Sequence, residues 1–387
     1  MRTPRYVVQS AWAVITCLMT AVAFVAISPT QSPASACVNW TGTQPATIAS
    51  FQTELLGVAG TSPCDLWAVG NAGASTLVEH WNGSAWKIVG SPNDGAPNWL
   101  YGVAALSRTD VWAVGSYTPD LGTHLQTLAL HWDGHSWTHI PSPNPGGSTH
   151  DDELLAVAAV SAKNAWAVGW YDDGTADRTL IEHWNGTKWR RVASPNFGSE
   201  QILQSVAATS ARNLWAVGKF LGAHSYRTLV LRWNGMAWKH VASPNAGTST
   251  DANTLFSVSA TSATNAWAVG RHGSSTDTRT LIEHWAGRAW HIMTGAALPG
   301  GYRELRGVAS ISTSDTWAVG KYRNGAGYDR TAVEHWNGTS WKREATPNFS
   351  TYDNHLLGVA AFTPSQVWAV GRYSDGSNYV PLAIHCC

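Results

Sequence analysis

Charged residues are scarce in this chain of 387 residues: Asp, Glu, Lys and Arg make up 13% of it, about half of their usual share in a soluble protein. The 25 basic and 25 acidic residues cancel. The chain therefore lacks the basic excess that neutralises phosphates, which argues against a nucleic-acid partner. Ala, Glu, Lys and Leu do not dominate, which excludes a long coiled coil. Tryptophan is abundant instead, with 23 residues, and so much aromatic surface excludes a disordered chain.

The first 36 residues have the layout of a secretory signal. Two arginines precede an apolar run over residues 11–27, and Ala34-Ser35-Ala36 has the A-x-A form of a cleavage site. We therefore expect residues 1–36 to be a signal peptide, the protein to be secreted, and no membrane span to remain after cleavage. The alternatives are a single membrane anchor and a lipoprotein acylated at Cys37. The apolar run is near the lower length limit for a span, and a lipobox prefers Leu where this chain has Ala34.

An internal repeat determines the expected fold class. The string Trp-Ala-Val-Gly occurs seven times, at intervals of 45 to 54 residues. Its copies begin at Trp67, Trp112, Trp166, Trp215, Trp267, Trp317 and Trp368. In six units a His-Trp or Arg-Trp string follows, and a further Trp comes five residues later. Most of the tryptophan excess therefore belongs to the repeat.

One unit shows the strand pattern clearly. LLAVAAVS, NAWAVGWY, TLIEHW and TKWRRVAS, between residues 154 and 194, are predicted strands. Asn185-Gly186 is a strong signal for a tight hairpin between the last two. Four short strands in 40 to 50 residues are typical of a propeller blade. We predict an all-β, seven-bladed β-propeller with four-stranded blades, forming a single domain over residues 37–387, with the Trp side chains between blades.

Two pieces of each unit carry a family resemblance. One is the apolar strand that ends in Gly (AWAVG), and the other is the Trp that opens the last strand, with Pro about six residues on (WRRVASP). These pieces resemble kelch-type and related bacterial propeller repeats over residues 37–387. The double Gly that kelch repeats carry after the second strand is missing here. The resemblance therefore implies propeller architecture and is weak for any one family.

The ring is expected to close through the two ends of the chain. The C-terminal LAIHCC aligns with the LIEHWN of other units, so the seventh blade lacks its fourth strand. Residues 40–50 are predicted to complete it, because Trp40 stands 15 residues before the first constant Leu, as Trp341 does before the last. In this alignment the last residue, Cys387, takes the position of Asn337.

The mature chain would contain Cys37, Cys64, Cys386 and Cys387, an even number that suggests disulfides in an exported protein. A bond from Cys37 to Cys386 or Cys387 would close the ring, and Cys64 could take the remaining C-terminal cysteine. Four cysteines allow three pairings, and the sequence does not choose among them. The alternatives are free thiols or a metal site, and no suitable His spacing supports the latter.

Repeated Glu-His pairs are candidates for acid–base chemistry. They stand before the third-strand Trp in four units, at residues 79–80, 182–183, 283–284 and 334–335. A residue that recurs around a ring most simply serves each blade. We therefore expect structural hydrogen bonding at these positions.

Function is expected where the repeat varies. The variable loops join second to third strands and one blade to the next, and strand alternation places both classes on one face, at the channel mouth. Directly before the constant Leu of the innermost strands stand Glu54, Trp99, Glu153, Ile202, Thr254, Glu304 and His355. Directly after that Leu stand Leu56, Tyr101, Leu155, Gln204, Phe256, Arg306 and Leu357. Nearby loops add Tyr302, Arg303, Tyr352, Asp353, His150, Asp151 and Asp152.

We predict a ligand site at the mouth. Its residues are Trp99, Tyr101, Glu153, Trp170, Glu304, Arg306 and His355. Aromatic faces beside carboxylates and arginine suit a sugar, so a carbohydrate or cell-envelope glycan is the best-matched ligand, closely followed by a protein or peptide. We expect no cofactor, no metal and a monomer.

Three alternatives stay open. The first is a glycoside hydrolase or polysaccharide lyase that uses Glu153 and Glu304 as a carboxylate pair, assisted by Tyr302, Arg306 and His355. Two carboxylates about 5–10 Å apart in one pocket would favour it, whereas carboxylates paired with arginine would argue against it. The second is a structural protein-interaction module, and the third is a solvated loop face without a ligand.

Overall fold

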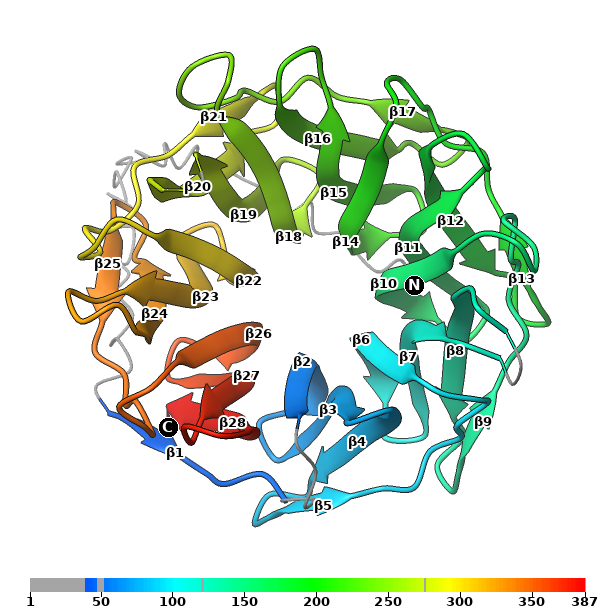
Figure 1. Ribbon diagram of the computed structural model, residues 1–387, viewed down its shortest axis with the longest axis horizontal. Helices are drawn as coiled ribbons and strands as arrows, with labels where there is room; N and C mark the ends of the chain where they lie inside the picture. The colour runs from blue at the N-terminus through cyan, green and yellow to red at the C-terminus, as the bar shows by residue number, and fades with distance from the viewer. Residues whose placement is uncertain (1–38, 47–51, 120–121, 275, 387) are drawn as a thin grey trace, which may run out of the picture. The chain divides into compact units, whose positions relative to one another are not determined.

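The computed structural model describes residues 39–46, 52–119, 122–274 and 276–386. In this part of the chain 28 strands form seven antiparallel four-stranded sheets, arranged as blades around a central channel (Figure 1). The prediction of an all-β, seven-bladed propeller is confirmed. The expected signal peptide and Cys37 lie outside the described residues. No helix in the described ranges is long and apolar enough to span a bilayer.

Each blade runs from an innermost strand at the channel to an outermost strand at the rim, and the blades are numbered one to seven in the chain order of their innermost strands. The innermost strands are β2 (Thr53–Ser62), β6 (Asn98–Ser107), β10 (Asp152–Ser161), β14 (Gln201–Ser210), β18 (Ala252–Ser262), β22 (Arg303–Ser312) and β26 (Asn354–Thr363). The second strands are β3 (Asp65–Ala72), β7 (Asp110–Tyr117), β11 (Asn164–Asp172), β15 (Asn213–Leu221), β19 (Asn265–Gly273), β23 (Asp315–Arg323) and β27 (Gln366–Ser374). The third strands are β4 (Ser75–Trp81), β8 (Gln126–Trp132), β12 (Asp177–Trp184), β16 (Tyr226–Trp233), β20 (Thr278–Trp285), β24 (Asp329–Trp336) and β28 (Tyr379–Cys386). The outermost strands are β5 (Trp86–Ile88), β9 (Trp137–His139), β13 (Trp189–Arg191), β17 (Trp238–His240), β21 (Trp290–Ile292), β25 (Trp341–Glu344) and β1 (Trp40–Gly42).

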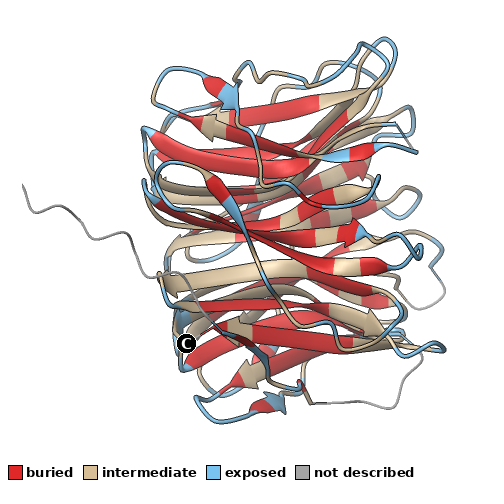
Figure 2. Cartoon of the chain, turned by 90° about the vertical axis from the view of Figure 1, so that its left-hand side faces the viewer, coloured by how far each residue is buried: buried red, intermediate tan, exposed pale blue. Residues whose placement is uncertain are grey.

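The Trp-Ala-Val-Gly strings form the buried middle of the blades (Figure 2). Their final Gly is required by a close backbone approach, because a Cβ at Gly169 would lie 1.9 Å from the carbonyl oxygen of Glu153. The pairing of β10 with β11 shifts register directly afterwards, between Leu154 and Ala156. The constant Leu154 is fully buried. The repeat thus fixes the backbone at the point where the variable side chains begin.

In six of the seven strings the Trp packs on two outer tryptophans of the next blade. The ring centroid of Trp67 lies 4.9 Å from that of Trp132 and 5.3 Å from that of Trp137. The same contacts join Trp112 to Trp184 and Trp189, Trp166 to Trp233 and Trp238, Trp215 to Trp285 and Trp290, Trp267 to Trp336 and Trp341, and Trp368 to Trp81 and Trp86. Such pairs contribute about 0.5–1.5 kcal/mol each beyond their buried area. The repeated tryptophans therefore join the blades, as expected.

The outer hairpins differ from the predicted tight turn. Trp184 pairs with Trp189, so the connection has four residues, 185–188. The side-chain oxygen of Asn185 accepts hydrogen bonds from the backbone N–H groups of Thr187 and Lys188, at 3.0 and 3.1 Å, while Gly186 adopts a φ of 93°. Asn therefore acts here as a local acceptor. The fourth strands are also shorter than predicted, since β13 has three residues.

The last blade is completed by β1, which pairs antiparallel with β28 (Figure 1). The strand completes this blade, as predicted, and the register places Trp40 opposite Cys386. The Trp40 ring lies 5.8 Å from that of Trp317, so it fills the gap between blades six and seven. The strand itself is shorter than the predicted residues 40–50, of which 47–50 lie outside the described residues.

The cysteines fit only part of the expected scheme. Cys386 is buried and disulfide-bonded, and its pairing with Cys37 or Cys387 stays a prediction, because both of those lie outside the described residues. Cys64 is an exposed free thiol, so the expectation that it joins a C-terminal cysteine is wrong. The reason is its place in blade one, where it packs beside Gly83 of the outer hairpin rather than at the closing strands.

The glutamates of the repeated Glu-His pairs are buried between blades. Glu79 and Glu334 accept hydrogen bonds from backbone N–H groups of the segments before their blades, at 2.9 and 2.7 Å, and Glu283 accepts one from a serine hydroxyl at 2.6 Å. Burial raises the pKa of Glu79 and Glu334 to about 7 and that of Glu283 to about 8. These carboxyl groups belong to the blade interfaces, which agrees with the structural interpretation.

Candidate functional site

The residues that follow the constant Leu converge on the channel. Leu56, Tyr101, Leu155, Gln204, Phe256, Arg306 and Leu357 line one cavity of about 250 Å³. They come from all seven blades, so the variable positions of the innermost strands share one opening. Tyr101 and Arg306, two of the predicted site residues, therefore face the same space.

A second set of variable residues stands one strand further out, directly after the constant Gly. In blades four to seven this position holds a cation: Lys219, Arg271, Lys321 and Arg372. In blades one to three it holds Asn71, Ser116 and Trp170. Each of these residues pairs across the strands with the residue before the constant Leu. At this position blades four to seven are cationic and blades one to three are uncharged. We call these the cationic side and the neutral side.

Glu153 is held on the neutral side by three uncharged donors. Its Oε1 accepts hydrogen bonds from the hydroxyls of Tyr101 at 2.9 Å and Ser116 at 3.1 Å. Its Oε2 accepts one from the indole Nε1 of Trp170 at 2.9 Å. Burial, together with the negative charge of Glu153, raises the pKa of Tyr101, which keeps its hydroxyl protonated. Three predicted site residues thus form one cluster between blades two and three.

Glu304 is held on the cationic side by ion pairs. Arg306 Nε lies 2.8 Å from its Oε1, and Arg271 Nη1 lies 3.1 Å from its Oε2. The hydroxyl of Tyr302 donates to the same Oε2 at 3.1 Å. Burial alone would raise the pKa of Glu304, but Arg306, Lys321 and Arg271 outweigh it and hold the pKa below its usual value. Glu304 is therefore a fixed carboxylate.

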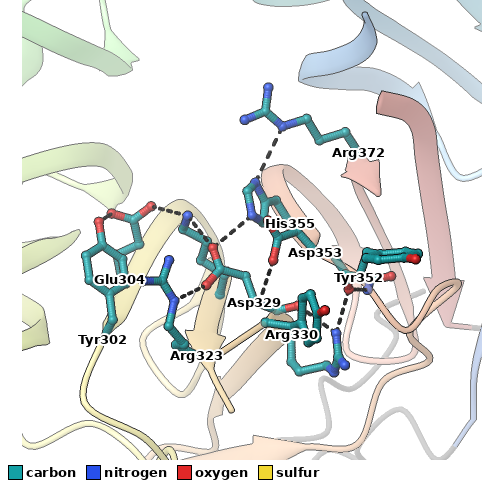
Figure 3. Close-up of polar contacts among 12 residues, drawn as sticks. Tyr302, Glu304, Arg323, Asp329, Arg330, Tyr352, Asp353, His355 and Arg372 are labelled. Atoms are coloured by element: carbon teal, nitrogen blue, oxygen red, sulfur yellow. Dashed lines mark hydrogen bonds and ion pairs between the residues drawn. The ribbon is translucent and has the colours of Figure 1, made fainter. Parts of the chain in front are cut away.

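His355 belongs to a neighbouring chain of contacts between blades six and seven (Figure 3). Its Nε2 lies 3.0 Å from Asp329, which also binds Lys321 at 2.7 Å and Arg323 at 2.9 Å. Arg372 donates to its Nδ1 at 3.4 Å. Burial lowers the pKa of His355, so the ring is neutral despite the nearby carboxylate. With both nitrogens engaged, His355 serves to position its neighbours.

The contacts continue from blade seven into blade one. Arg372 Nη1 lies 2.5 Å from Glu54 Oε2. The Arg306 guanidinium, on the other side, lies 4.1 Å from the centre of the Phe256 ring in blade five. These contacts thus form one network that spans blades five, six, seven and one.

Asp329, Asp353 and His355 lie close enough to suggest a metal site, with ligand atoms within 4.8 Å of one another. Their atoms are already engaged, however. Both oxygens of Asp329 are in ion pairs with Lys321 or Arg323, and Asp353 Oδ1 accepts the backbone N–H of Asp329 at 2.8 Å. Three ligand atoms bound by cations and N–H groups do not suit a metal, so we interpret the group as an ion-pair network.

The other predicted residues have more local roles. Trp99 is half-buried at the start of β6, where it pairs with Ser116. Asp152 is buried, and its Oδ1 accepts the backbone N–H of Gly146 at 3.0 Å, so it supports its own loop. Asp151 Oδ1 accepts the backbone N–H of Leu125, in the loop between β7 and β8, at 2.8 Å.

Several residues of the site were not assigned to it from the sequence. Arg271, Lys321 and Arg372 occupy the position directly after the constant Gly, and a comparison of that position among the units would have found them. Asp329 and Arg323 begin and end strands at a variable loop. They carry no repeat signal, so only the fold brings them to the site.

Glu153 and Glu304 are held by separate sets of partners. Glu153 lies in blade three and Glu304 in blade six, and each has its own set of donors. Glu304 is paired with two arginines, which is the arrangement that argues against the hydrolase alternative.

Solved structures of other proteins share the propeller fold of this chain. No protein-family model and no curated protein matches the sequence, so nothing supports kelch repeats specifically. A solved structure of YCF48 bound to D1 peptide has 14% identity and a TM-score of 0.55, covering 91% of this chain and 99% of that one. YCF48 from Cyanidioschyzon merolae has 17% identity and a TM-score of 0.54, covering 89% and 98%.

A polysaccharide lyase is also similar in fold. This ulvan lyase, bound to -[GlcA(1-4)Rha3S]-, has 10% identity and a TM-score of 0.54, covering 87% of this chain and 95% of its own. At such identities the similarity establishes the propeller fold alone.

Proposed function

We propose that this protein is a secreted glycan-binding propeller whose ligand lies across the mouth of the central channel. The observation that carries the proposal is the division of the mouth. The blades repeat one core, yet a Tyr101–Glu153–Trp170 cluster stands on one side of the mouth and an arginine-rich network around Glu304 stands on the other. A ring that served only its own stability would not need two different sides.

The chemistry of both sides suits a saccharide. The aromatic side offers Trp170 and Tyr101 beside a carboxylate that can accept hydrogen bonds from hydroxyl groups. The cationic side offers donors that stay charged at neutral pH. Sites of this kind combine aromatic surface with a few placed polar groups.

Binding is favoured over catalysis. Tyr302 has its pKa raised by burial and by Glu304, so it does not serve as a base near neutral pH. Both nitrogens of His355 are engaged. A lyase remains the second candidate, because a propeller of similar fold is a polysaccharide lyase. A peptide ligand is the third, because YCF48 of similar fold binds a peptide.

The test is a glycan array probed with the mature chain, residues 37–387, followed by product analysis on each glycan bound. We expect binding without new products. Products with a new double bond would establish the lyase instead. An array without any binding would overturn the proposal and leave the peptide alternative.

A further inference from the structure

A separate cavity of about 380 Å³ opens on the cationic side, among blades four, five and six. Its walls are Tyr226 at the start of β16, Tyr302 directly before β22, and Arg271 and His272 of β19. Its volume falls within the range of small-molecule sites, about 300–1,000 Å³. It is joined to the mouth through Arg271 and Tyr302, which both bind Glu304.

Arg271 is only partly used by the protein. In the described part of the chain its side-chain hydrogen bonds run from Nη1, to Tyr302 and Glu304. The side chain is 38% exposed. A guanidinium has five N–H donors in a planar fork, so the remaining donors of Arg271 are available to a group in the cavity.

Arg271 shares its carboxylate partner with other cations. Salt bridges join Arg271, Arg306, Lys321 and Arg323 to only two carboxylates, Glu304 and Asp329. The nearby Asp277 is paired with Arg279, and Glu200 with Lys219. Arg271 therefore has no carboxylate of its own, which suits an anion on its remaining donors.

His272 adds a polar group without a partner. Its Nδ1 is buried, and no described residue hydrogen-bonds to it. A buried polar atom without a partner is unfavourable, and a ligand hydroxyl would satisfy it. Burial lowers the pKa of His272, so the ring is neutral and can accept or donate one hydrogen bond.

We propose that this cavity binds the acidic sugar unit of a polysaccharide, with the carboxylate on Arg271 and the sugar ring against Tyr302. A carboxylate matches the planar fork of arginine, and the pair is charge-assisted. Tyr302 and Tyr226 provide the aromatic surface, and His272 meets a hydroxyl. This inference rests on the proposed function and adds the chemical class of the glycan.

The experiment is calorimetric titration of the mature chain with hexagalacturonic acid and with its fully methyl-esterified form. The esterified hexasaccharide keeps the sugar chain and lacks the negative charges. We expect the acid to bind at least tenfold more tightly. Arg271→Met should abolish this preference and Tyr302→Phe should weaken it. Arg212→Met, which removes an exposed cation from a turn on the opposite face, should leave it unchanged. Melting temperatures establish that each variant is folded.

Equal affinity for the two forms, or a preference that survives Arg271→Met, would overturn the inference while leaving glycan binding intact. Binding of neither hexasaccharide would also overturn it, and the proposed function would then fall only if the glycan array is blank as well. A sulfated, carboxyl-free carrageenan hexasaccharide that binds as tightly as the acid, and through Arg271, would replace the carboxylate by a sulfate and overturn the stated class.

Discussion

Trp40 lies opposite Cys386 across the last pair of strands of blade seven, in the register that Trp341 and Trp336 hold in blade six. A cysteine thus replaces a tryptophan at the place where the two ends of the chain meet. The β1 strand contributes three residue pairs to this closure. So short a strand is weakly held by hydrogen bonds alone, which explains why a covalent link is useful here.

We predict a disulfide between Cys37 and Cys386. Cys37→Ser should then lower stability by about 2–5 kcal/mol, because the bond closes a loop over residues 37–386. The measurement is a non-reducing peptide map by mass spectrometry, followed by the melting temperature of the variant. Cys64 should appear in the map as a free thiol. A Cys386–Cys387 bond in the map, or an unchanged melting temperature, would contradict the prediction.

Glu182 is predicted to destabilise the blade interface. Both carboxyl oxygens are buried and have no hydrogen-bond partner in the described ranges. Glu79 and Glu334 accept hydrogen bonds from the backbone N–H groups of Ala46 and Ala296. In the segment before the blade of Glu182, the residue that corresponds to these two alanines is Pro143, and proline has no N–H to donate.

Glu182→Leu should therefore raise the unfolding free energy by about 1–3 kcal/mol, since an unpaired buried polar group is removed. Leucine suits the position, because Leu130 and Leu231 occupy it in blades two and four. Glu79→Leu is the matched control. It leaves the Ala46 N–H unpaired and should give no gain in melting temperature. A gain of equal size in both variants would show that the missing partner is not the cause.

The stabilising effect of Glu182→Leu should depend on pH. Burial raises the pKa of Glu182 well above its usual value, so the folded chain binds a proton that the unfolded chain releases. The destabilisation caused by this carboxyl group is therefore smallest below the unfolded pKa, about 4.3, and it grows as pH rises toward the folded pKa. The melting-temperature difference between variant and wild type should increase from pH 5 to pH 8.5. A difference that is constant over this range would mean that Glu182 keeps an ordinary pKa.

Trp170→Phe should weaken glycan binding about tenfold, or about 1.4 kcal/mol. The aromatic surface is largely kept, but the indole donor that holds Glu153 at 2.9 Å is lost, and the carboxylate is free to turn away. Trp132→Phe makes the same change on the opposite face, where Nε1 donates to the backbone oxygen of Arg108. When both variants are titrated with a glycan that the array identifies, the affinity should fall in Trp170→Phe and stay unchanged in Trp132→Phe.

The repeat made the architecture predictable. Seven Trp-Ala-Val-Gly strings set the number of blades, and one shared spacing was enough to place Trp40 in the strand that completes the last blade. These features depend on local patterns that each unit repeats. The outer turn was less predictable, because Asn185 forms a four-residue connection in place of a two-residue turn.

The site was predictable at the innermost strands and much less so beyond them. Tyr101, Glu153 and Trp170 were foreseen as one region, and so were Tyr302 and Arg306 beside Glu304. The second-strand partner of Glu304, Arg271, and the partners of His355 were not placed there. Arg271 and Arg372 lie on second strands, and Asp329 lies at the start of a third. Their contacts depend on how neighbouring blades stack. The pairing of Glu54 with Arg372, 318 residues apart, exists only once the ring has closed.

The decisive experiment on a glycan across the channel mouth is the crystal structure of residues 37–387 with an acidic hexasaccharide that this chain binds. We expect density running from Trp170 to Tyr302, with a carboxylate on Arg271. Density confined to the outer blade edges or to the opposite face, with an empty mouth, would contradict it.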